Sequence, residues 1–148
     1  MSTWKIDQIG KKPKLNRPIL IEGLPGIGNV GKVAVDFLID ELKAKKIYDI
    51  TSYTFPHSVF VNEDNLVELP RIEIFYKKFN GKGHDLILLG GDVQPTDEVS
   101  SYEFSEKILD LVLFPFDSKT FKFSSAGGEK TLDNFKILFL KYISIKFL

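Results

Sequence analysis

The feature that most constrains the fold is a short aliphatic run that leads into a glycine-rich turn and then into a helical pattern. Residues 19–21 are Ile-Leu-Ile, and the run stops at Gly23. An apolar run without alternation is typical of a strand that is covered on both faces, as the strands of parallel sheets are. A second run of this kind spans residues 86–89 and stops at Gly90. We therefore predict that the two runs are neighbouring or near-neighbouring strands at the centre of an α/β sheet.

Two stretches carry the pattern of helices that pack on such a sheet. In the first, apolar residues recur three and four positions apart, which predicts a helix with one apolar stripe against the sheet. The residues of this stripe are Val30, Val33, Ala34, Phe37, Leu38 and Leu42. If Phe37 belongs to the core, its replacement by Ala costs about 3 to 5 kcal/mol. In the second stretch, Glu103 follows Ser100 at the spacing of a capping box, so we predict that a helix begins at Ser100.

The order of the expected elements defines the fold class. Strands are also expected at residues 50–55, 58–61 and 71–79. Each doubly covered strand is followed by a helix, and right-handed crossovers place such helices on the faces of the sheet. We predict a three-layer α/β sandwich with a mixed, mostly parallel central sheet. One domain then fills residues 1–148, with a loose N-terminal arm over residues 1–17 in which Trp4, Ile6 and Ile9 can pin one edge of the sheet.

Composition excludes several classes of function. The 148 residues carry 20 Lys and Arg against 20 Asp and Glu, so there is no net charge to attract nucleic acid or an anionic membrane. There is no cysteine, which excludes disulfides, thiolate metal sites and a cysteine nucleophile. No apolar run approaches the roughly 20 residues of a membrane-spanning helix, and the N-terminus has no signal-peptide pattern. We expect a cytoplasmic protein that binds neither nucleic acid nor membranes.

The turn after the first strand contains a G-x-G-x-x-G motif that permits three interpretations. In a dinucleotide-binding fold such glycines hold a pyrophosphate at a helix N-terminus, but they follow the strand almost at once, whereas three residues intervene here. A P-loop would use Lys32, but Val33 stands where a hydroxyl residue must hold magnesium. The third interpretation is that the glycines allow a sharp turn and a close approach of helix and sheet. We favour this structural role and keep as the alternative a phosphate cradle of Gly26, Gly28, Gly31 and Lys32.

Polar residues beyond the second aliphatic run form the other candidate site. Asp92 and Gln94 follow its carboxyl end, the edge where open α/β sheets usually bind ligands, and we expect them to face the glycine loop. A metal would need histidines near these acids, but His57 and His84 are remote from them in sequence. A lone His57 without a nucleophile partner is more often a structural hydrogen-bonder than a catalytic base. We therefore assign no catalytic residue, no metal site and no cofactor, and enzymatic activity is the less favoured interpretation.

Several short segments, taken in their order along the chain, resemble one known family. The segments are residues 18–32 (PILIEGLPGIGNVGK), Phe55-Pro56, Leu69-Pro70-Arg71, residues 85–94 (DLILLGGDVQ) and Tyr102-Glu103. Together they resemble the proteasome assembly chaperone 2 family in its archaeal form, over roughly residues 17–111. The resemblance implies an α/β sandwich similar to the nucleoside-phosphorylase fold and no established catalysis. It also implies homo-oligomers that give ATP-independent help in the assembly of proteasome rings.

The C-terminal part departs from the family pattern. The pattern fades after Leu111, and residues 112–148 form a divergent, phenylalanine-rich segment, as in a truncated member. Archaeal relatives that engage the proteasome are expected to end in a hydrophobe, a Tyr and one further residue, whereas this chain ends in Lys-Phe-Leu. The residues that we assign to protein interaction are Phe114, Phe116, Phe121, Phe123, Phe147 and Leu148.

Two functions of different class follow from these observations. The first is a protein-interaction module, an ATP-independent chaperone for proteasome assembly that acts as a homo-oligomer and has proteasome α subunits as a further partner. The alternative is a nucleotide-binding enzyme that uses residues 23–32 as a phosphate cradle. The module is favoured because no acid, base or nucleophile of recognised spacing accompanies the glycine loop. The C-terminal phenylalanines, in contrast, supply apolar surface for association.

Overall fold

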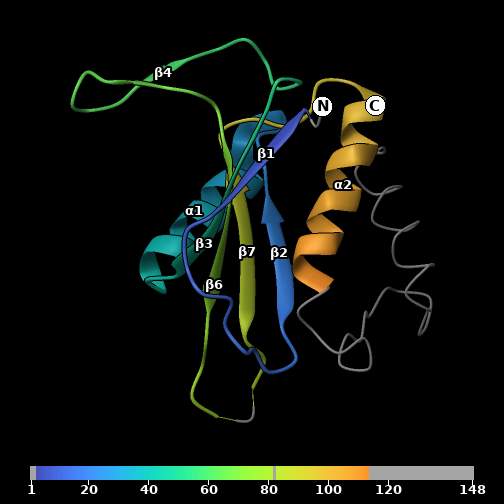
Figure 1. Ribbon diagram of the computed structural model, residues 1–148. Coiled ribbons are helices and arrows are strands. Elements are labelled where there is room, and N and C mark those ends of the chain that lie inside the picture. Colours follow the sequence, from blue (N-terminus) through green and yellow to red (C-terminus); the bar gives the residue numbers. More distant parts are fainter. Residues whose placement is uncertain (1–2, 82, 114–148) are drawn as a thin grey trace.

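A mixed five-stranded sheet lies between two helices in the computed structural model, which describes residues 3–81 and 83–113 (Figure 1). The strands of this sheet are β1 (Trp4–Gln8), β2 (Ile19–Gly23), β3 (Lys45–Ser52), β6 (Ile72–Lys77) and β7 (Leu86–Gly91), in the spatial order β1-β3-β6-β7-β2. The helices are α1 (Val30–Glu41) and α2 (Glu98–Leu113), and a short 3-10 helix, η1 (Ile27–Asn29), precedes α1. The predicted α/β fold with a mixed central sheet is confirmed.

The two helices cover opposite faces of the sheet. Successive side chains of a strand point to opposite faces, so contacts with neighbouring residues of β7 show which face each helix covers. Val35 of α1 lies over Gly23 and Gly90, at positions where a Cβ atom on either glycine would contact it. Phe104 of α2 belongs instead to the cluster on the other face, which includes Leu89 of β7. The layers are therefore helix, sheet and helix. Neither of these helices, in the part of the chain that the structure describes, is long and apolar enough to cross a membrane.

The main core lies between the sheet and α2. Its buried members are Trp4, Ile47, Tyr48, Ile50, Phe55, Ile72, Ile74, Ile87, Leu89, Val93, Phe104, Ile108 and Val112. Trp4 stacks on Phe104 with ring centroids 5.8 Å apart and meets Phe55 edge-on at 5.5 Å. In the N-terminal arm predicted for residues 1–17, Trp4 pins one edge of the sheet as expected, but Trp4–Gln8 are not loose, because they form β1 and pair antiparallel with β3. Burial of one aromatic ring holds this edge strand, although its own sequence has little strand pattern.

The strand directions differ from the prediction of a mostly parallel sheet. β2 and β7 pair in parallel, whereas the pairs β1–β3, β3–β6 and β6–β7 are antiparallel. β2 and β7 are neighbours, as predicted, but β2 is not central. It forms an edge of the described sheet, and Ile19 is 45% exposed. An aliphatic run indicates that a strand is covered above and below, but it carries no information on how many strands flank it.

α1 packs on the sheet with a different stripe from the one that its spacing predicts. Val35 is buried, whereas Val33 and Phe37 are 63% and 61% exposed. The helix carries apolar residues on more than one face, and the sheet decides which of them turns inward. Gly23 and Gly90 have no side chains, so α1 can approach the sheet closely over them, and Val35 fills that space. Phe37 therefore lies outside the core, so the condition for a large cost of its replacement by Ala is not met.

α2 begins at Glu98 rather than at Ser100, because Asp97 caps it. The Asp97 carboxylate accepts a hydrogen bond from the backbone N–H of Ser100 at 2.9 Å and one from the Ser100 hydroxyl at 2.6 Å. The side-chain bond, and then the backbone bond, lower the pKa of the Asp97 carboxyl. Ser100 therefore supports the cap from inside the helix instead of providing it.

A small hairpin projects from the sheet between the end of β3 and the start of β6 (Figure 1). Its strands are β4 (Phe60–Val61) and β5 (Val67–Glu68), and we call residues 56–70 the hairpin. The side-chain oxygen of Asn62 closes the turn by accepting from the N–H groups of Asp64 at 3.0 Å and Leu66 at 2.9 Å. Figure 1 shows the hairpin reaching away from the sheet on the same side of the molecule as α1.

Candidate functional site

The glycine loop and the end of β7 meet at one edge of the sheet. Lys32, in the first turn of α1, places its Nζ 3.0 Å from Asp36 and 3.5 Å from Asp92. Asp92 follows β7, so the structure brings this acid to the glycine loop. Burial acts to lower the pKa of Lys32, but its hydrogen bonds to the two carboxylates and their charges outweigh burial and raise it. Lys32 is therefore a protonated partner of two acids.

This arrangement does not favour a phosphate cradle. A phosphate at Lys32 would have to displace two carboxylates and would meet their negative charge. Val33 is exposed and offers no hydroxyl to a magnesium ion. Among residues 3–81 and 83–113, no three His, Asp or Glu side chains come close enough together to hold a metal ion.

Two of the glycines around this loop have a clear structural role. A Cβ atom on Gly23 would lie 2.3 Å from the carbonyl oxygen of Gly31 and 2.5 Å from Cγ2 of Val35, so only glycine lets α1 approach β2 this closely. Gly28 has a φ of 72°, which glycine adopts without strain. Gly26 is different, because a Cβ atom there would meet nothing within 4 Å. The packing role thus applies to Gly23 and the turn role to Gly28.

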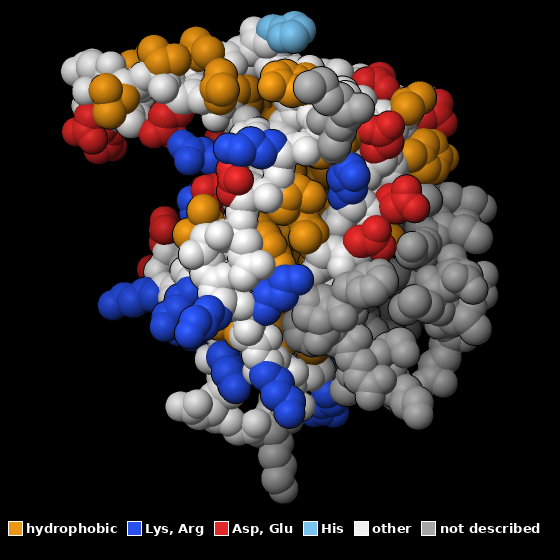
Figure 2. Space-filling model, in the orientation of Figure 1, with side chains coloured by type: hydrophobic (Ala, Val, Ile, Leu, Met, Phe, Trp, Pro, Cys, Tyr) orange, Lys and Arg blue, Asp and Glu red, His pale blue; other side chains and the backbone are white. Residues whose placement is uncertain are grey.

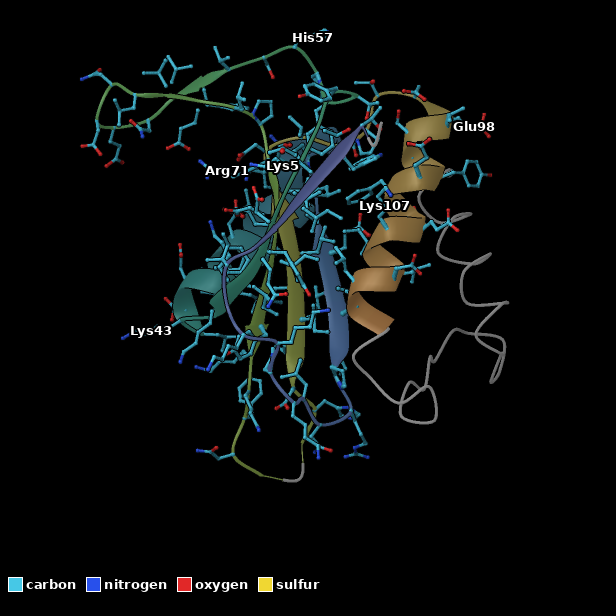
Figure 3. All side chains as sticks on the ribbon, viewed as in Figure 1. Lys5, Lys43, His57, Arg71, Glu98 and Lys107 are labelled. Atoms are coloured by element: carbon cyan, nitrogen blue, oxygen red, sulfur yellow. The ribbon has the colours of Figure 1, made fainter. Side chains whose placement is uncertain are left out.

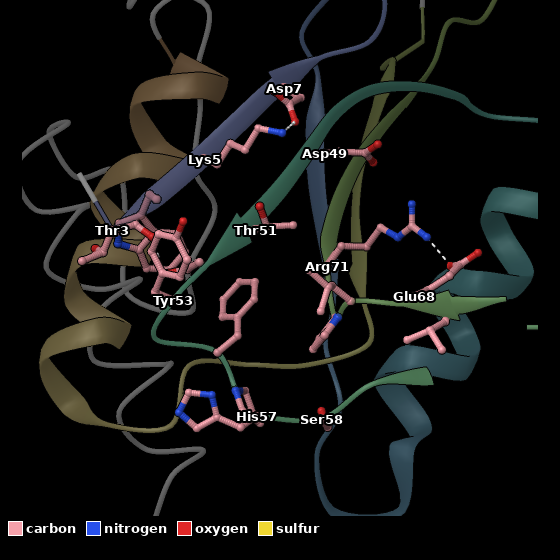
Figure 4. A pocket seen from close by; sticks show the side chains of 17 residues that line it. Thr3, Lys5, Asp7, Asp49, Thr51, Tyr53, His57, Ser58, Glu68 and Arg71 are labelled. Atoms are coloured by element: carbon pink, nitrogen blue, oxygen red, sulfur yellow. Dashed lines mark hydrogen bonds and ion pairs between the residues drawn. The ribbon is translucent and has the colours of Figure 1, made fainter. Parts of the chain in front are cut away.

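A hollow of about 880 Å³ lies between the base of the hairpin and the face of β1 and β3 (Figure 4). Its charges are paired within the protein: Lys5 contacts Asp7 at 2.7 Å, and Arg71 contacts Glu68. His57 lies on its rim and is exposed. The lining is mainly apolar, and neighbouring side chains already neutralise these charges, so we assign no catalytic role to the hollow.

Two apolar surfaces lie open on the side of α1. One is on the hairpin, where Figure 2 shows hydrophobic side chains gathered, and its exposed members are Val59, Phe60, Val61, Leu66, Val67 and Leu69. The other is on α1, where Val30, Val33 and Phe37 are exposed. We did not assign any of these residues to protein interaction from sequence. The signal was present, because two short apolar runs around a polar four-residue turn are typical of a hairpin.

The exposed charges are unevenly distributed over the molecule (Figures 2 and 3). Near the end of the sheet where β3 and β7 begin, the exposed lysines are Lys11, Lys12, Lys14, Lys43, Lys45 and Lys78. Glu98, at the start of α2, lies near the opposite end, as does the turn of the hairpin with Glu63 and Asp64. The absence of net charge therefore conceals a basic end and an acidic end.

The residues assigned to protein interaction from the sequence lie elsewhere in the chain. Phe114, Phe116, Phe121, Phe123, Phe147 and Leu148 are all outside the described residues. Their assignment stays a prediction.

The fold and the internally neutralised loop define an α/β protein with exposed apolar side chains on the hairpin and on α1. The chain belongs to the PAC2 family, whose model matches residues 20–113. This confirms the family resemblance that the sequence motifs carry. The likeness to the nucleoside-phosphorylase fold stays a prediction.

Solved and curated relatives agree with this family. PbaB of Pyrococcus furiosus, an archaeal proteasome activator, is 43% identical with a TM-score of 0.68, over 76% of this chain and 47% of PbaB. PbaA of the same organism, an archaeal homolog of proteasome-assembly chaperone, is 22% identical with a TM-score of 0.50, over 78% of this chain and 44% of PbaA, and supports the fold alone. Protein MJ1210 of Methanocaldococcus jannaschii is 35% identical over 97 residues, which are 66% of this chain and 36% of that protein. The chain thus spans less than half the length of these relatives.

Proposed function

We propose that this chain is a protein-interaction module that assists a proteasome of the archaeal type, without ATP, as a cytoplasmic homo-oligomer. The observation that carries the proposal is the likeness to PbaB, an archaeal proteasome activator, at 43% identity over 76% of this chain. Identity at this level is well above that of the more distant relative PbaA, which is 22% identical.

The chemistry of the glycine loop supports a function without nucleotide. Lys32 is the cation that a phosphate would need, and it is held by Asp36 and Asp92. Val33 leaves a magnesium ion without its hydroxyl ligand. A module that works through surface contacts needs neither a cation for phosphate nor a hydroxyl ligand for magnesium.

The exposed apolar side chains support a function that depends on binding to other proteins. Phe37 and the hairpin's Phe60 lie on surfaces that the described part of the chain leaves open. Large exposed apolar patches are typical of protein contacts. We assign one such contact to a second copy of this chain. Proteasome α subunits are the other partner, with the last three residues as the contact.

Purified α subunits of an archaeal proteasome test this function. The full chain is mixed with them in the presence and absence of ATP, and ring formation is followed by native electrophoresis and by electron microscopy. We expect the chain to bind the α subunits and to speed ring formation equally under both conditions. The proposal would be contradicted if the chain did not bind the α subunits and did not change ring formation. An effect seen only with ATP would favour the nucleotide-binding alternative.

A matched pair of tail variants tests the contact itself. If the C-terminus docks on the α subunits, the double change Lys146→Leu and Phe147→Tyr creates the expected ending and strengthens binding. Deletion of the last three residues then weakens it. Equal binding by both variants would place the contact outside the tail.

A further inference from the structure

The hairpin carries apolar side chains that the described part of its own copy leaves exposed. Val61 is 65% exposed, and Val67 and Leu69 are each 67% exposed. β4 and β5 pair over only two residues each. Because an isolated two-stranded hairpin is marginally stable in water, contact with another surface would stabilise it.

The outer face of α1 carries a matching apolar stripe. Val30, Val33 and Phe37 recur at helical spacing, so their exposed side chains share one face of the helix. Lys43 and Lys45, both exposed, follow the end of α1, and Figure 3 shows Lys43 at that end. The helix therefore presents an apolar stripe that is followed by two positive charges.

The hairpin and the α1 stripe match in length and in charge. From Ser58 to Glu63 an extended chain covers about 17 Å. From Val30 to Glu41, α1 also covers about 17 Å, and Lys43 follows two residues beyond its end. The hairpin turn carries Glu63 and Asp64, both exposed, at the end of its apolar segment. Apolar side chains can thus pack on apolar ones while the acidic turn reaches the lysines.

We propose that the hairpin of one copy lies along α1 of a second copy, with its acidic turn against Lys43 and Lys45 of that copy. This inference names the surfaces of the homo-oligomer and rests on that part of the proposed function. The hairpin and α1 lie on the same side of the molecule (Figure 1), so a two-fold axis allows both contacts to form at once. Each copy then covers the stripe of the other.

A second copy is the occupant that the charges favour. Glu63 and Asp64 would repel nucleic acid, and both halves of the charge match are present in one chain without net charge. Val61 lies opposite Val67 in the β4–β5 pair, so these two side chains share one face of the hairpin and can pack together on α1 of the second copy.

Charge reversal in the full chain tests the placement, with the dissociation constant measured by sedimentation equilibrium. The double change Glu63→Lys and Asp64→Lys should weaken association at least tenfold. The double change Lys43→Glu and Lys45→Glu should do the same. All four changes in one chain should bring the dissociation constant back to within about threefold of the unmodified chain, because the pairing is restored with reversed signs.

The matched control reverses two exposed lysines at the same end of the sheet but outside the contact, Lys11→Glu and Lys14→Glu. These changes should leave association unaltered, and circular dichroism checks that each variant is folded. The placement would be overturned if neither double reversal changed the dissociation constant, or if the four changes together did not restore association. That result would leave the proposed self-association intact. A chain that stays monomeric at high micromolar concentration would overturn both the self-association and the placement of the hairpin on α1. Binding to α subunits is measured separately and does not depend on either outcome.

Cysteine crosslinking gives a second, independent reading, since the chain has no cysteine of its own. A mixture of the Asp64→Cys and Lys43→Cys variants should give a disulfide-linked dimer under mild oxidation, well above the yield of either variant alone. Asp64→Cys mixed with Glu106→Cys, an exposed position on α2, serves as the control. Equal yields in the two mixtures would contradict the proposed contact.

Discussion

Trp4 donates its indole N–H to a carboxylate oxygen of Glu103 at 3.0 Å, although 99 positions separate the two residues. The bond joins β1, at one edge of the sheet, to α2. Trp4 also stacks on Phe104, the next residue of the helix. Because this is the chain's single tryptophan, its fluorescence reports directly on how β1 docks against α2.

Replacing Trp4 by Ala should lower the free energy of unfolding by about 3 to 5 kcal/mol, since it removes a buried aromatic side chain from the core. Replacing it by Phe keeps a ring but loses the hydrogen bond, and should cost less. Urea unfolding followed by circular dichroism measures both. A cost below about 1 kcal/mol for Trp4→Ala would show that β1 is not part of the core.

The same substitution on the two helices should have very different effects on stability. Phe104→Ala should cost about 3 to 5 kcal/mol because Phe104 is buried in the core. Phe37→Ala should change the stability of the monomer by less than about 1 kcal/mol, because Phe37 is 61% exposed. Unfolding is measured at a protein concentration low enough to avoid association. Similar costs for the two variants would mean that α1 packs with the stripe that its spacing predicts.

Gly23→Ala should destabilise the protein by about 1 to 3 kcal/mol or more, because the new methyl group would overlap the Gly31 carbonyl and Val35. Gly26→Ala is the matched control in the same loop. A Cβ atom there meets nothing within 4 Å, so the change should be neutral or slightly stabilising. Thermal unfolding of both variants compares them, and equal loss would contradict the close approach of α1 to β2.

The Asp97 cap should make stability depend on pH in the acid range. Its pKa is lower in the folded state than the unperturbed value of 3.8, so the carboxylate stabilises the fold above that value. The contribution is lost as the pH falls through the folded-state pKa. Asp97→Asn keeps a side chain that can cap a helix but removes the titration. The melting temperature of the variant should therefore fall less than that of the unmodified chain between pH 5 and pH 2, and parallel curves would contradict the cap.

The glycine loop should not bind nucleotide tightly. Calorimetry with ATP, NAD or magnesium should give no binding at micromolar concentration, because Lys32 is already paired with Asp36 and Asp92. Asp92→Ala is a useful comparison, since it frees Lys32 from one of its acids. Micromolar affinity of the unmodified chain for any of the three ligands would overturn the preference for an interaction module.

Local chemistry along the chain was sufficient to predict several features of this protein. The two aliphatic runs identified β2 and β7 as adjacent strands, since a continuous apolar segment needs cover on both faces. The run of glycines identified the turn into α1, and Val33 counted against a P-loop without any knowledge of the fold. These inferences depend on neighbours in sequence, or on the identity of a single residue, and the sequence contains both.

Other features depend on contacts between distant segments. β2 is an edge strand and most of the strand pairs are antiparallel. Strand order and direction depend on which segments of the chain meet in space. The buried side of α1 was decided by Gly23 and Gly90, whose missing side chains left room for Val35 and turned Phe37 outward. The fold brings Asp92, at the end of β7, next to Lys32, and this ion pair disfavours phosphate binding by Lys32. A one-dimensional pattern can show that a helix has apolar faces, but the surface it packs against selects one of them.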